Sequence, residues 1–298
     1  MRSTRIVWVV GLLAAMLLAV ADPGQTRMGG VMGKKTGKPA GDAATSAPVP
    51  VDEHGQPVDE ADMGAFMPMR ADLTHMRAKG FVATGLRPVF PDGVDCPPVN
   101  CSFGASTRGD GSPRSMRFFR GLHGGMDIPV PEDTPILAMA DGTVAHLSPG
   151  MAIGGIGVVL RHAPEDTGLP VWTYTEYKHL RELPPLRVGQ RVRMGEVVAI
   201  AGDTGTAGGY YGEEGHLHLH LDAFQSDTDA FHVAGVVIPE HGAWLDPLAL
   251  FHGPPLDSSS LRDLPDRTKR VPVACMLPDG TVRPAGARVI WPFACTPR

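Results

Sequence analysis

Hydrophobic and polar residues alternate in short runs through the middle of the chain, and turn-forming Gly and Pro residues separate the runs. The runs cover residues 134–140, 143–147, 157–161, 172–177, 191–194, 197–201 and 215–224. A two-residue period with regular turn signals is typical of β-strands, and this region shows no long helical period. We therefore predict an all-β domain over residues 100–252, with a small antiparallel β-sandwich or barrel-like core.

The flanking segments have different patterns. Residues 22–60 are rich in Gly, Ala, Pro, Lys and Asp and contain few large apolar residues, which predicts a disordered linker. Residues 61–99 are read as an N-terminal extension, with a short helix over 62–79 that Pro68 interrupts. Residues 253–298 are read as a C-terminal tail, polar at first and then β-rich.

The first residues have the pattern of a signal peptide. Two arginines precede an apolar run over residues 6–20, and Ala19-Val-Ala21 fits a cleavage site. An uncleaved membrane anchor is the alternative, but the run is shorter than the roughly 20 residues that cross a bilayer. We expect residues 1–21 to direct export to the periplasm, the cell envelope or the medium, with membrane contact only through this segment.

Composition and charge indicate a folded protein and argue against a nucleic-acid partner. Hydrophobic residues make up 43% of the chain, which is enough for a core, and the net charge is only −5. The sequence contains no basic run of the kind that binds nucleic acid, so we predict no nucleic-acid partner. It does not indicate the oligomeric state.

Four cysteines are expected to be oxidised in an exported chain. They are Cys96, Cys101, Cys275 and Cys295, and four cysteines permit three pairings. We favour the local pairs Cys96–Cys101 and Cys275–Cys295. The second pair flanks Pro278-Asp-Gly280, a turn signal, and would close a disulfide hairpin in the tail. Neither pair has the spacing of a zinc site.

His123 and Asp127 enclose two glycines. In a straight strand they would lie about 13 Å apart, which is too far for two ligands of one ion with bonds near 2 Å. If both bind one metal, the chain must bend between them. Gly124 and Gly125 allow such a bend at the least steric cost.

His216, His218 and His220 alternate with leucines. In a strand the three imidazoles share one face and the leucines turn to the core. Neighbours on that face lie about 6.6 Å apart, so one can ligate a metal while the next reaches a bound water. A solvated polar face or a metal-scavenging tract would give the same pattern. His179 ends an aromatic strand. On its own it would be read as a structural histidine, and it becomes a candidate site residue only together with the other histidines.

Taken in order, these motifs resemble a known family. The set H-x-G-x-D, Y-x-H-L and H-x-H is similar to that of the lysostaphin-type (LytM-like) zinc endopeptidases of bacterial cell walls. Further similarities lie in Ser102-Phe-Gly104 with Arg108, in Gly202-Asp-Thr-Gly205 and in Trp244 to Leu248. The resemblance covers about half of the chain.

The resemblance implies a β core with a substrate groove, similar to the duplicated hybrid motif fold, and one Zn²⁺ per chain. His123, Asp127 and His218 would ligate the zinc. His216 would be the general base, and His179 would stabilise the oxyanion or orient the water. Because Leu221-Asp222 resembles the residues after the usual H-x-H, His220 is an alternative ligand with His218 as the base. Glu214, which precedes the tract, favours the first register.

The implied function is a zinc metalloendopeptidase that hydrolyses the stem or bridge peptides of peptidoglycan. One alternative is a catalytically inactive relative that activates or scaffolds other cell-wall hydrolases, which would bind no stoichiometric zinc. Another is a metallopeptidase that acts on secreted proteins. The sequence does not specify which peptide bond is cut, the type of wall or how the protein is targeted to it.

Overall fold

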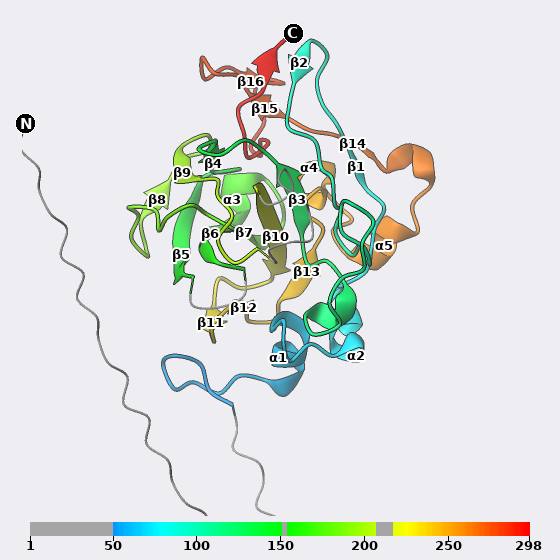
Figure 1. Ribbon diagram of the computed structural model, residues 1–298, viewed down its shortest axis with the longest axis vertical. Helices are drawn as coiled ribbons and strands as arrows, with labels where there is room; N and C mark the ends of the chain where they lie inside the picture. Colours follow the sequence, from blue (N-terminus) through cyan, green and yellow to red (C-terminus); the bar gives the residue numbers. More distant parts are fainter. Residues whose placement is uncertain (1–49, 151–153, 207–216) are drawn as a thin grey trace, which may run out of the picture. The chain divides into compact units, whose positions relative to one another are not determined.

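The computed structural model in Figure 1 describes residues 50–150, 154–206 and 217–298. All of these described residues belong to one compact unit. The predicted signal peptide, residues 22–49 of the predicted linker, and His216 lie outside the described residues. Within the described ranges, no helix has both the length and the apolar character needed to cross a membrane.

An antiparallel sheet of seven strands forms the centre of the molecule (Figure 1). In spatial order the strands are β13 (Ala243–Leu245), β10 (His218–Ser226), β7 (Trp172–Lys178), β6 (Ile156–His162), β5 (Gly142–Pro149) and β8 (Arg191–Val192), and β3 (Met126–Pro129) also pairs with β10. Each predicted run of the central region overlaps a strand, so the prediction of an all-β antiparallel core is confirmed.

Two-stranded ribbons and short helices surround this sheet. The ribbons are β1 (Arg87–Val89) with β14 (Arg270–Pro272), β2 (Val94–Asp95) with β17 (Thr296–Pro297), β4 (Pro135–Leu137) with β9 (Val197–Ile200), β11 (Phe231–Val233) with β12 (Val237–Pro239), and β15 (Cys275–Met276) with β16 (Val282–Arg283). The helices are α1 (Glu60–Phe66), α2 (Leu73–Ala78), α3 (Pro164–Thr167), α4 (Ala249–His252) and α5 (Ser258–Arg262), with the 3₁₀ turns η1 (Phe119–Gly121) and η2 (Asp266–Thr268).

The central sheet buries apolar side chains on both faces. On β10, Leu219 and Leu221 belong to one hydrophobic cluster and Phe224 belongs to another. On β6, Leu160 belongs to the first of these clusters and Val159 to the second. Side chains alternate between the two faces of a strand, so one face holds the leucines of β10 and the opposite face holds His218 and His220.

The N-terminal extension packs on the face that carries the histidines. The Phe66 ring stacks on Trp244 with centroids 5.7 Å apart, and Trp244 Nε1 donates to the carbonyl of Ala65 at 3.0 Å. The break between α1 and α2 contains Pro68, as the sequence predicts. Residues 50–60 are structured rather than disordered, because Val58 is buried in the same cluster.

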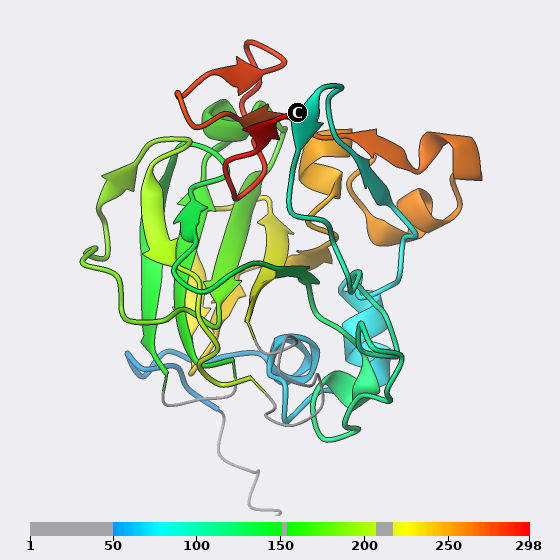
Figure 2. The same ribbon diagram turned by 45° about the horizontal axis from the view of Figure 1, so that its top comes forward.

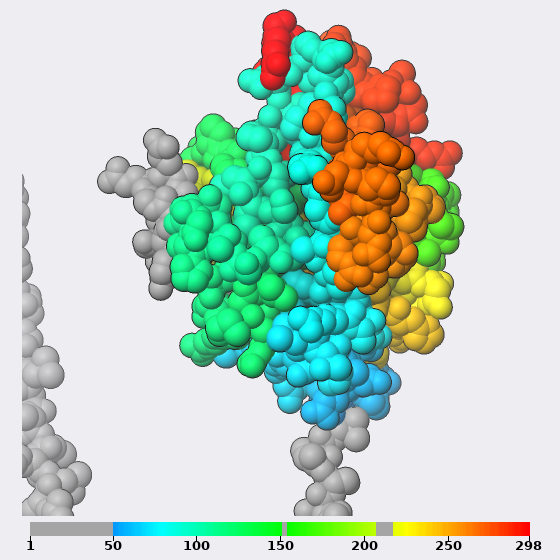
Figure 3. All heavy atoms as spheres, turned by 90° about the vertical axis from the view of Figure 1, so that its right-hand side faces the viewer, coloured from blue at the N-terminus to red at the C-terminus, as the bar shows by residue number. Residues whose placement is uncertain are grey.

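The extension also contacts the C-terminal tail. Figure 3 shows the two segments side by side on one face, where β1 pairs in parallel with β14. At one end of the molecule β2 pairs with the last strand, β17 (Figure 2). Residues far apart in sequence therefore enclose the central sheet together.

The disulfide pairing differs from both predicted pairs. The structure contains a Cys96–Cys295 bond, and Cys101 and Cys275 are buried thiols, so the predictions of Cys96–Cys101 and Cys275–Cys295 are wrong. The cause is the antiparallel pairing of β2 with β17, which opposes Asp95 and Thr296 and so brings the next residues, Cys96 and Cys295, together. The predicted hairpin around Asp279-Gly280 does form, as β15 and β16, without a disulfide of its own.

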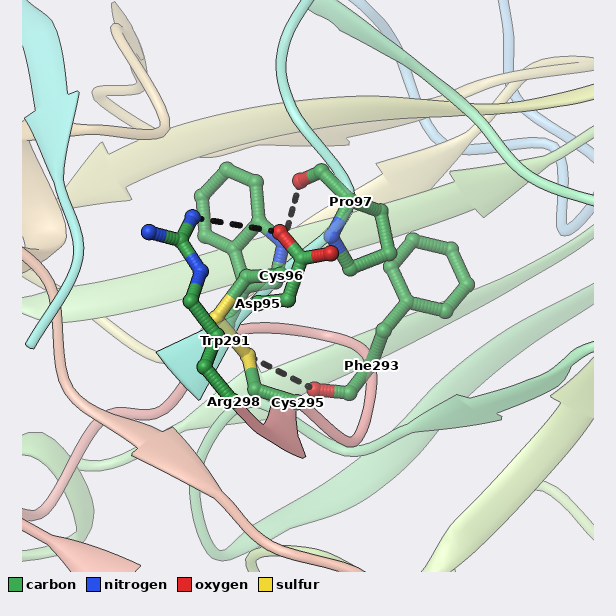
Figure 4. The surroundings of a disulfide bond; sticks show 7 residues. All are labelled: Asp95, Cys96, Pro97, Trp291, Phe293, Cys295 and Arg298. Atoms are coloured by element: carbon green, nitrogen blue, oxygen red, sulfur yellow. Dashed lines mark hydrogen bonds and ion pairs between the residues drawn. A yellow bond between two sulfur atoms is a disulfide. The ribbon is translucent and has the colours of Figure 1, made fainter. Parts of the chain in front are cut away.

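Other contacts hold the two segments together at this point (Figure 4). Trp291 Nε1 donates to the carbonyl of Pro97 at 3.1 Å, and Arg298 Nη2 lies 3.3 Å from Asp95 Oδ1. Trp291 is fully buried, so the tail contributes to the main core rather than extending from it.

Candidate metal centre and active site

β3 and β10 place an aspartate and a histidine opposite each other. His220 is the direct partner of Asp127 in this antiparallel pair, whereas His218 lies opposite Pro129. Directly opposed residues in such a pair have Cα atoms about 4.5–5.5 Å apart, so their side chains can coordinate the same ion. The pairing register therefore favours His220 over His218 as the neighbour of Asp127.

His123 reaches this pair through a bend in the chain. Gly124 and Gly125 form the bend, and a Cβ atom on Gly125 would lie 2.2 Å from the carbonyl oxygen of Leu221. No larger residue fits there without a backbone shift. The bend brings His123 Nε2 to 2.9 Å from Asp127 Oδ1. The predicted bend at the two glycines is thus confirmed.

Three potential ligand atoms converge at this point. His123 Nε2, Asp127 Oδ1 and His220 Nδ1 lie 2.9, 3.0 and 2.9 Å from one another. In each imidazole the ring nitrogen that faces away from this point makes a hydrogen bond. His123 Nδ1 donates to the Ser102 carbonyl at 3.0 Å, and His220 Nε2 donates to Asp222 Oδ1 at 2.8 Å. In neutral rings the two facing nitrogens then carry lone pairs. Lone pairs 3.0 Å apart repel each other unless a cation lies between them.

The donor set suits a zinc ion. Two imidazole nitrogens and a carboxylate oxygen around tetrahedral Zn²⁺ would lie roughly 3.3 Å apart, close to the observed spacing. Burial opposes protonation of His123, but the Asp127 carboxylate outweighs it and raises the pKa of His123 to about 9. Burial also opposes ionisation of Asp127, yet His123 and the other imidazoles hold its pKa well below the usual range. The cluster attracts a positive charge, which zinc can supply in place of a proton.

Arg114 holds the second oxygen of the aspartate. Its Nη2 lies 3.3 Å from Asp127 Oδ2 and 2.9 Å from the sulfur of Cys101, and its Nε donates to the carbonyl of Thr107. Cys101 Sγ lies within 4.8 Å of ligand atoms of His123 and Asp127, so these three residues form a second possible donor set. The guanidinium on that sulfur disfavours a cation there, so the tighter triangle with His220 is the better candidate for a metal centre.

His218 and His179 lie beside this triangle. His218 Nε2 is 3.6 Å from Asp127 Oδ1, and the rings of His179 and His218 are 4.7 Å apart. His179 Nδ1 donates to the carbonyl of Thr204 at 2.8 Å, which leaves a lone pair on Nε2. Burial, together with His218 and His220, lowers the pKa of His179 well below its usual value, so the ring is neutral at pH 7.

A buried ion network lies behind His220. Asp222 accepts from His220 on one oxygen and from Lys178 Nζ on the other at 2.6 Å, and Lys178 lies 3.0 Å from Glu176. Burial favours the neutral form of Asp222, but His220 and Lys178 outweigh it and lower its pKa. Burial likewise disfavours the Lys178 ammonium, and the two carboxylates more than compensate by raising its pKa. The imidazole of His220 is thereby fixed in one orientation.

A groove of about 710 Å³ opens over the cluster. Its floor carries His123, Asp127, His179, His218 and His220, and the loop over residues 107–119 forms one wall. A chain segment with an amide bond can therefore approach the converging ligand atoms and both neighbouring histidines at once.

Comparison with known proteins agrees with this geometry. The profile of peptidase family M23 matches residues 121–230, the part that contains His123, Asp127, His179, His218 and His220. These residues form a peptidase family M23 domain. A curated protein of Haemophilus influenzae described as an uncharacterized metalloprotease is 36% identical to this chain over 113 residues. This match covers 38% of the present chain but only 19% of that protein, so the chain spans about a fifth of the length of the curated relative.

Solved structures of similar proteins include M23-type peptidases. The catalytic domain of the antimicrobial peptidase lysostaphin from Staphylococcus simulans is 22% identical, with a TM-score of 0.32, over 40% of this chain and 77% of that one. A zinc-containing peptidase from Vibrio cholerae is 20% identical, with a TM-score of 0.32, over 54% of this chain and 40% of that one.

Most of the predicted site residues come together in the M23 domain. His123, Asp127, His179 and His218 surround one point, and His220 completes the triangle of converging side-chain atoms. The predicted base, His216, lies outside the described residues, so that role stays a prediction.

Sequence analysis missed the residues that support the ligands. These are Glu176 and Lys178 on β7, Asp222 on β10, and Arg114 in the loop. A signal for Asp222 was present, because a residue two positions after His220 must share its face of the strand.

Proposed function

We propose that this protein is a zinc-dependent endopeptidase that hydrolyses peptide bonds of peptidoglycan in the cell envelope. In this proposal His123, Asp127 and His220 hold one zinc ion, His218 is the general base, and His179 orients the attacking water. One observation carries it. Two imidazoles with fixed outer hydrogen bonds place their remaining ring nitrogens within 3.0 Å of each other and of one carboxylate oxygen.

Each side chain has a chemical task that its position supports. When bound, zinc acts as a Lewis acid that polarises a carbonyl group and acidifies water. His218 lies at the edge of the ligand set, where its imidazole can accept a proton from the attacking water and return it to the leaving amine. Asp222 holds His220, and Arg114 holds Asp127, so that their ligating atoms do not rotate away.

His179 suits the orientation of water better than donation to an oxyanion. Its Nδ1 proton is committed to the Thr204 carbonyl, so Nε2 accepts a hydrogen bond. Donation would require a second proton on the ring, which its lowered pKa disfavours. Of the two roles that the family resemblance implies for His179, we therefore propose water orientation.

The test combines metal content with hydrolysis. The full chain, loaded with zinc, is expected to bind about one ion and to release soluble peptides from purified peptidoglycan. His218→Ala should retain zinc and lose hydrolysis, while the exposed His241→Ala serves as a matched control and should change neither. Absence of zinc after reconstitution would refute the proposal and favour an inactive scaffolding relative. Cleavage of glycine-rich protein substrates but not of wall peptides would indicate the secreted-protein alternative.

A further inference from the structure

One wall of the groove is basic. The loop over residues 107–119 contains three arginines, Arg108, Arg114 and Arg117, and one acidic residue, Asp110. All three arginines line the groove, and Lys178 lines it as well. Asp127 is the single acidic residue among the described lining residues. The groove therefore offers a substrate more positive than negative charge even before a metal ion is counted.

The four basic groups differ in how they are held. Lys178 is balanced by two buried carboxylates behind it. Arg114 contacts Asp127, and the buried Arg108 donates to the Pro113 carbonyl and to Ser112 Oγ. The contacts of these three side chains therefore stabilise the site and the loop themselves.

Arg117 is different. Its side chain is exposed and forms no ion pair within the described residues, and its guanidinium carbon lies 5.8 Å from the centroid of the Phe118 ring. Phe118 also lines the groove. A cation placed over an aromatic face is attracted to it, so the ring holds the guanidinium near the groove.

The loop that presents Arg117 is fixed at several points. Thr107 and Pro113 form an antiparallel bridge, and Arg114 Nε donates back to the Thr107 carbonyl. The next residue in the wall, Phe119, packs on Trp244 with ring centroids 5.3 Å apart, and its backbone N–H donates to Pro68. Arg117 is thus presented on an anchored wall, which reduces the entropy lost on binding.

We propose that Arg117 binds a carboxylate of the substrate beside the scissile amide, so that the groove selects peptides carrying a free carboxylate over neutral ones. This inference rests on the proposed endopeptidase function and names its substrate class. An arginine pairs with a carboxylate through two parallel hydrogen bonds, which gives directional recognition. The carboxylate is either a chain terminus or an acidic side chain, and both present the same two oxygens.

Binding is measured in the full zinc-loaded chain carrying His218→Ala, so that turnover does not interfere. The probe is the synthetic α-linked tetrapeptide Ala-D-Glu-Lys-D-Ala in three forms: free acid, C-terminal amide, and D-Gln in place of D-Glu. We expect the free acid to bind best and one amide form to bind about tenfold more weakly. The amide form that loses affinity identifies the source of the carboxylate.

The Arg117→Gln variant should bind the free acid about tenfold more weakly, and its affinity for the amide form that already binds weakly should not change. Arg117→Lys should recover part of the lost affinity. Arg120→Gln, an exposed arginine of the same segment that does not line the groove, is the matched control and should bind like the parent protein. Equal affinity for all three peptides, no detectable binding, or an unchanged Arg117→Gln variant would overturn the inference. Zinc content and wall hydrolysis of the unmodified protein are measured separately, so a failure of the endopeptidase proposal is distinguishable.

Discussion

His220 lies directly opposite Asp127 in the β3–β10 pair, and its Nδ1 is 2.9 Å from Asp127 Oδ1. The neighbouring His218 is one step further along the same face of β10, with Nε2 3.6 Å from that oxygen. Because of this offset we propose different roles for His218 and His220, although their side chains are chemically identical. In the proposal, the residue opposite the aspartate ligates the metal, and the residue beside it acts as the general base.

The first prediction concerns this division of roles. Replacing His220 by Ala removes one of three ligand atoms, so the variant should lose the zinc that the parent chain binds at about one per chain. Replacing His218 by Ala should leave the zinc in place and lower the rate of peptide hydrolysis by about 10²–10⁴-fold, the usual contribution of a general base. Metal analysis and peptide-release assays on the two variants provide the measurement. Zinc lost from His218→Ala but kept in His220→Ala would restore the register that the sequence favours.

The second prediction concerns the support behind the ligand. Asp222→Asn keeps the shape of the side chain but removes the charge that orients His220, so zinc affinity should fall by about 10–100-fold. Competition with a chromophoric chelator measures this change. Asp227→Asn, in an exposed residue just beyond the same strand, is the matched control and should leave the affinity unaltered. Equal affinities in Asp222→Asn and the parent chain would mean that His220 needs no carboxylate to hold its ring.

Local pattern was sufficient for part of this architecture. Alternation identified the strands, and the glycines after His123 identified the bend, because both depend on neighbours in sequence. The choice between His218 and His220 depends on which residue of β10 opposes Asp127, and that register involves strands about 90 residues apart. The Cys96–Cys295 bond depends in the same way on pairing across 199 residues. Neither long-range pairing leaves a local signal in the sequence.

The third prediction tests the disulfide. Alkylation of the denatured, unreduced protein should label Cys101 and Cys275, while Cys96 and Cys295 react only after reduction. Peptide mass mapping provides the measurement. Finding a Cys96–Cys101 or a Cys275–Cys295 peptide would contradict the structure.

The same bond should contribute to stability, because it joins the extension to the tail. Replacing Cys96 and Cys295 together by Ser should lower the free energy of unfolding by about 2–5 kcal/mol, since a crosslink over a long loop restricts the unfolded chain. Urea unfolding of the double variant and the parent, with both free thiols unchanged, measures the difference. An unchanged unfolding midpoint would show that β2–β17 pairing and the Trp291 contacts hold the two segments without the bond.

The fourth prediction is a pH dependence of stability that arises from Asp246. This carboxyl is 3% exposed, and burial raises its pKa to about 6, although Thr84 donates a hydrogen bond that favours ionisation. The folded protein therefore holds a proton between pH 4 and 6 that the unfolded chain has released. In that window stability falls as the pH rises, and the loss amounts to on the order of 3 kcal/mol.

Asp246→Asn should abolish this slope, because the amide does not titrate and can still accept the hydrogen bond that Leu248 N–H donates at 3.0 Å. The measurement is the free energy of unfolding in urea at pH 4, 5, 6 and 7 for the variant and the parent chain. The parent should lose stability relative to the variant across the range, and the difference should level off above pH 6. A constant difference would mean that Asp246 titrates in the folded protein at its unfolded pKa, and that Thr84 compensates the cost of burying the charge.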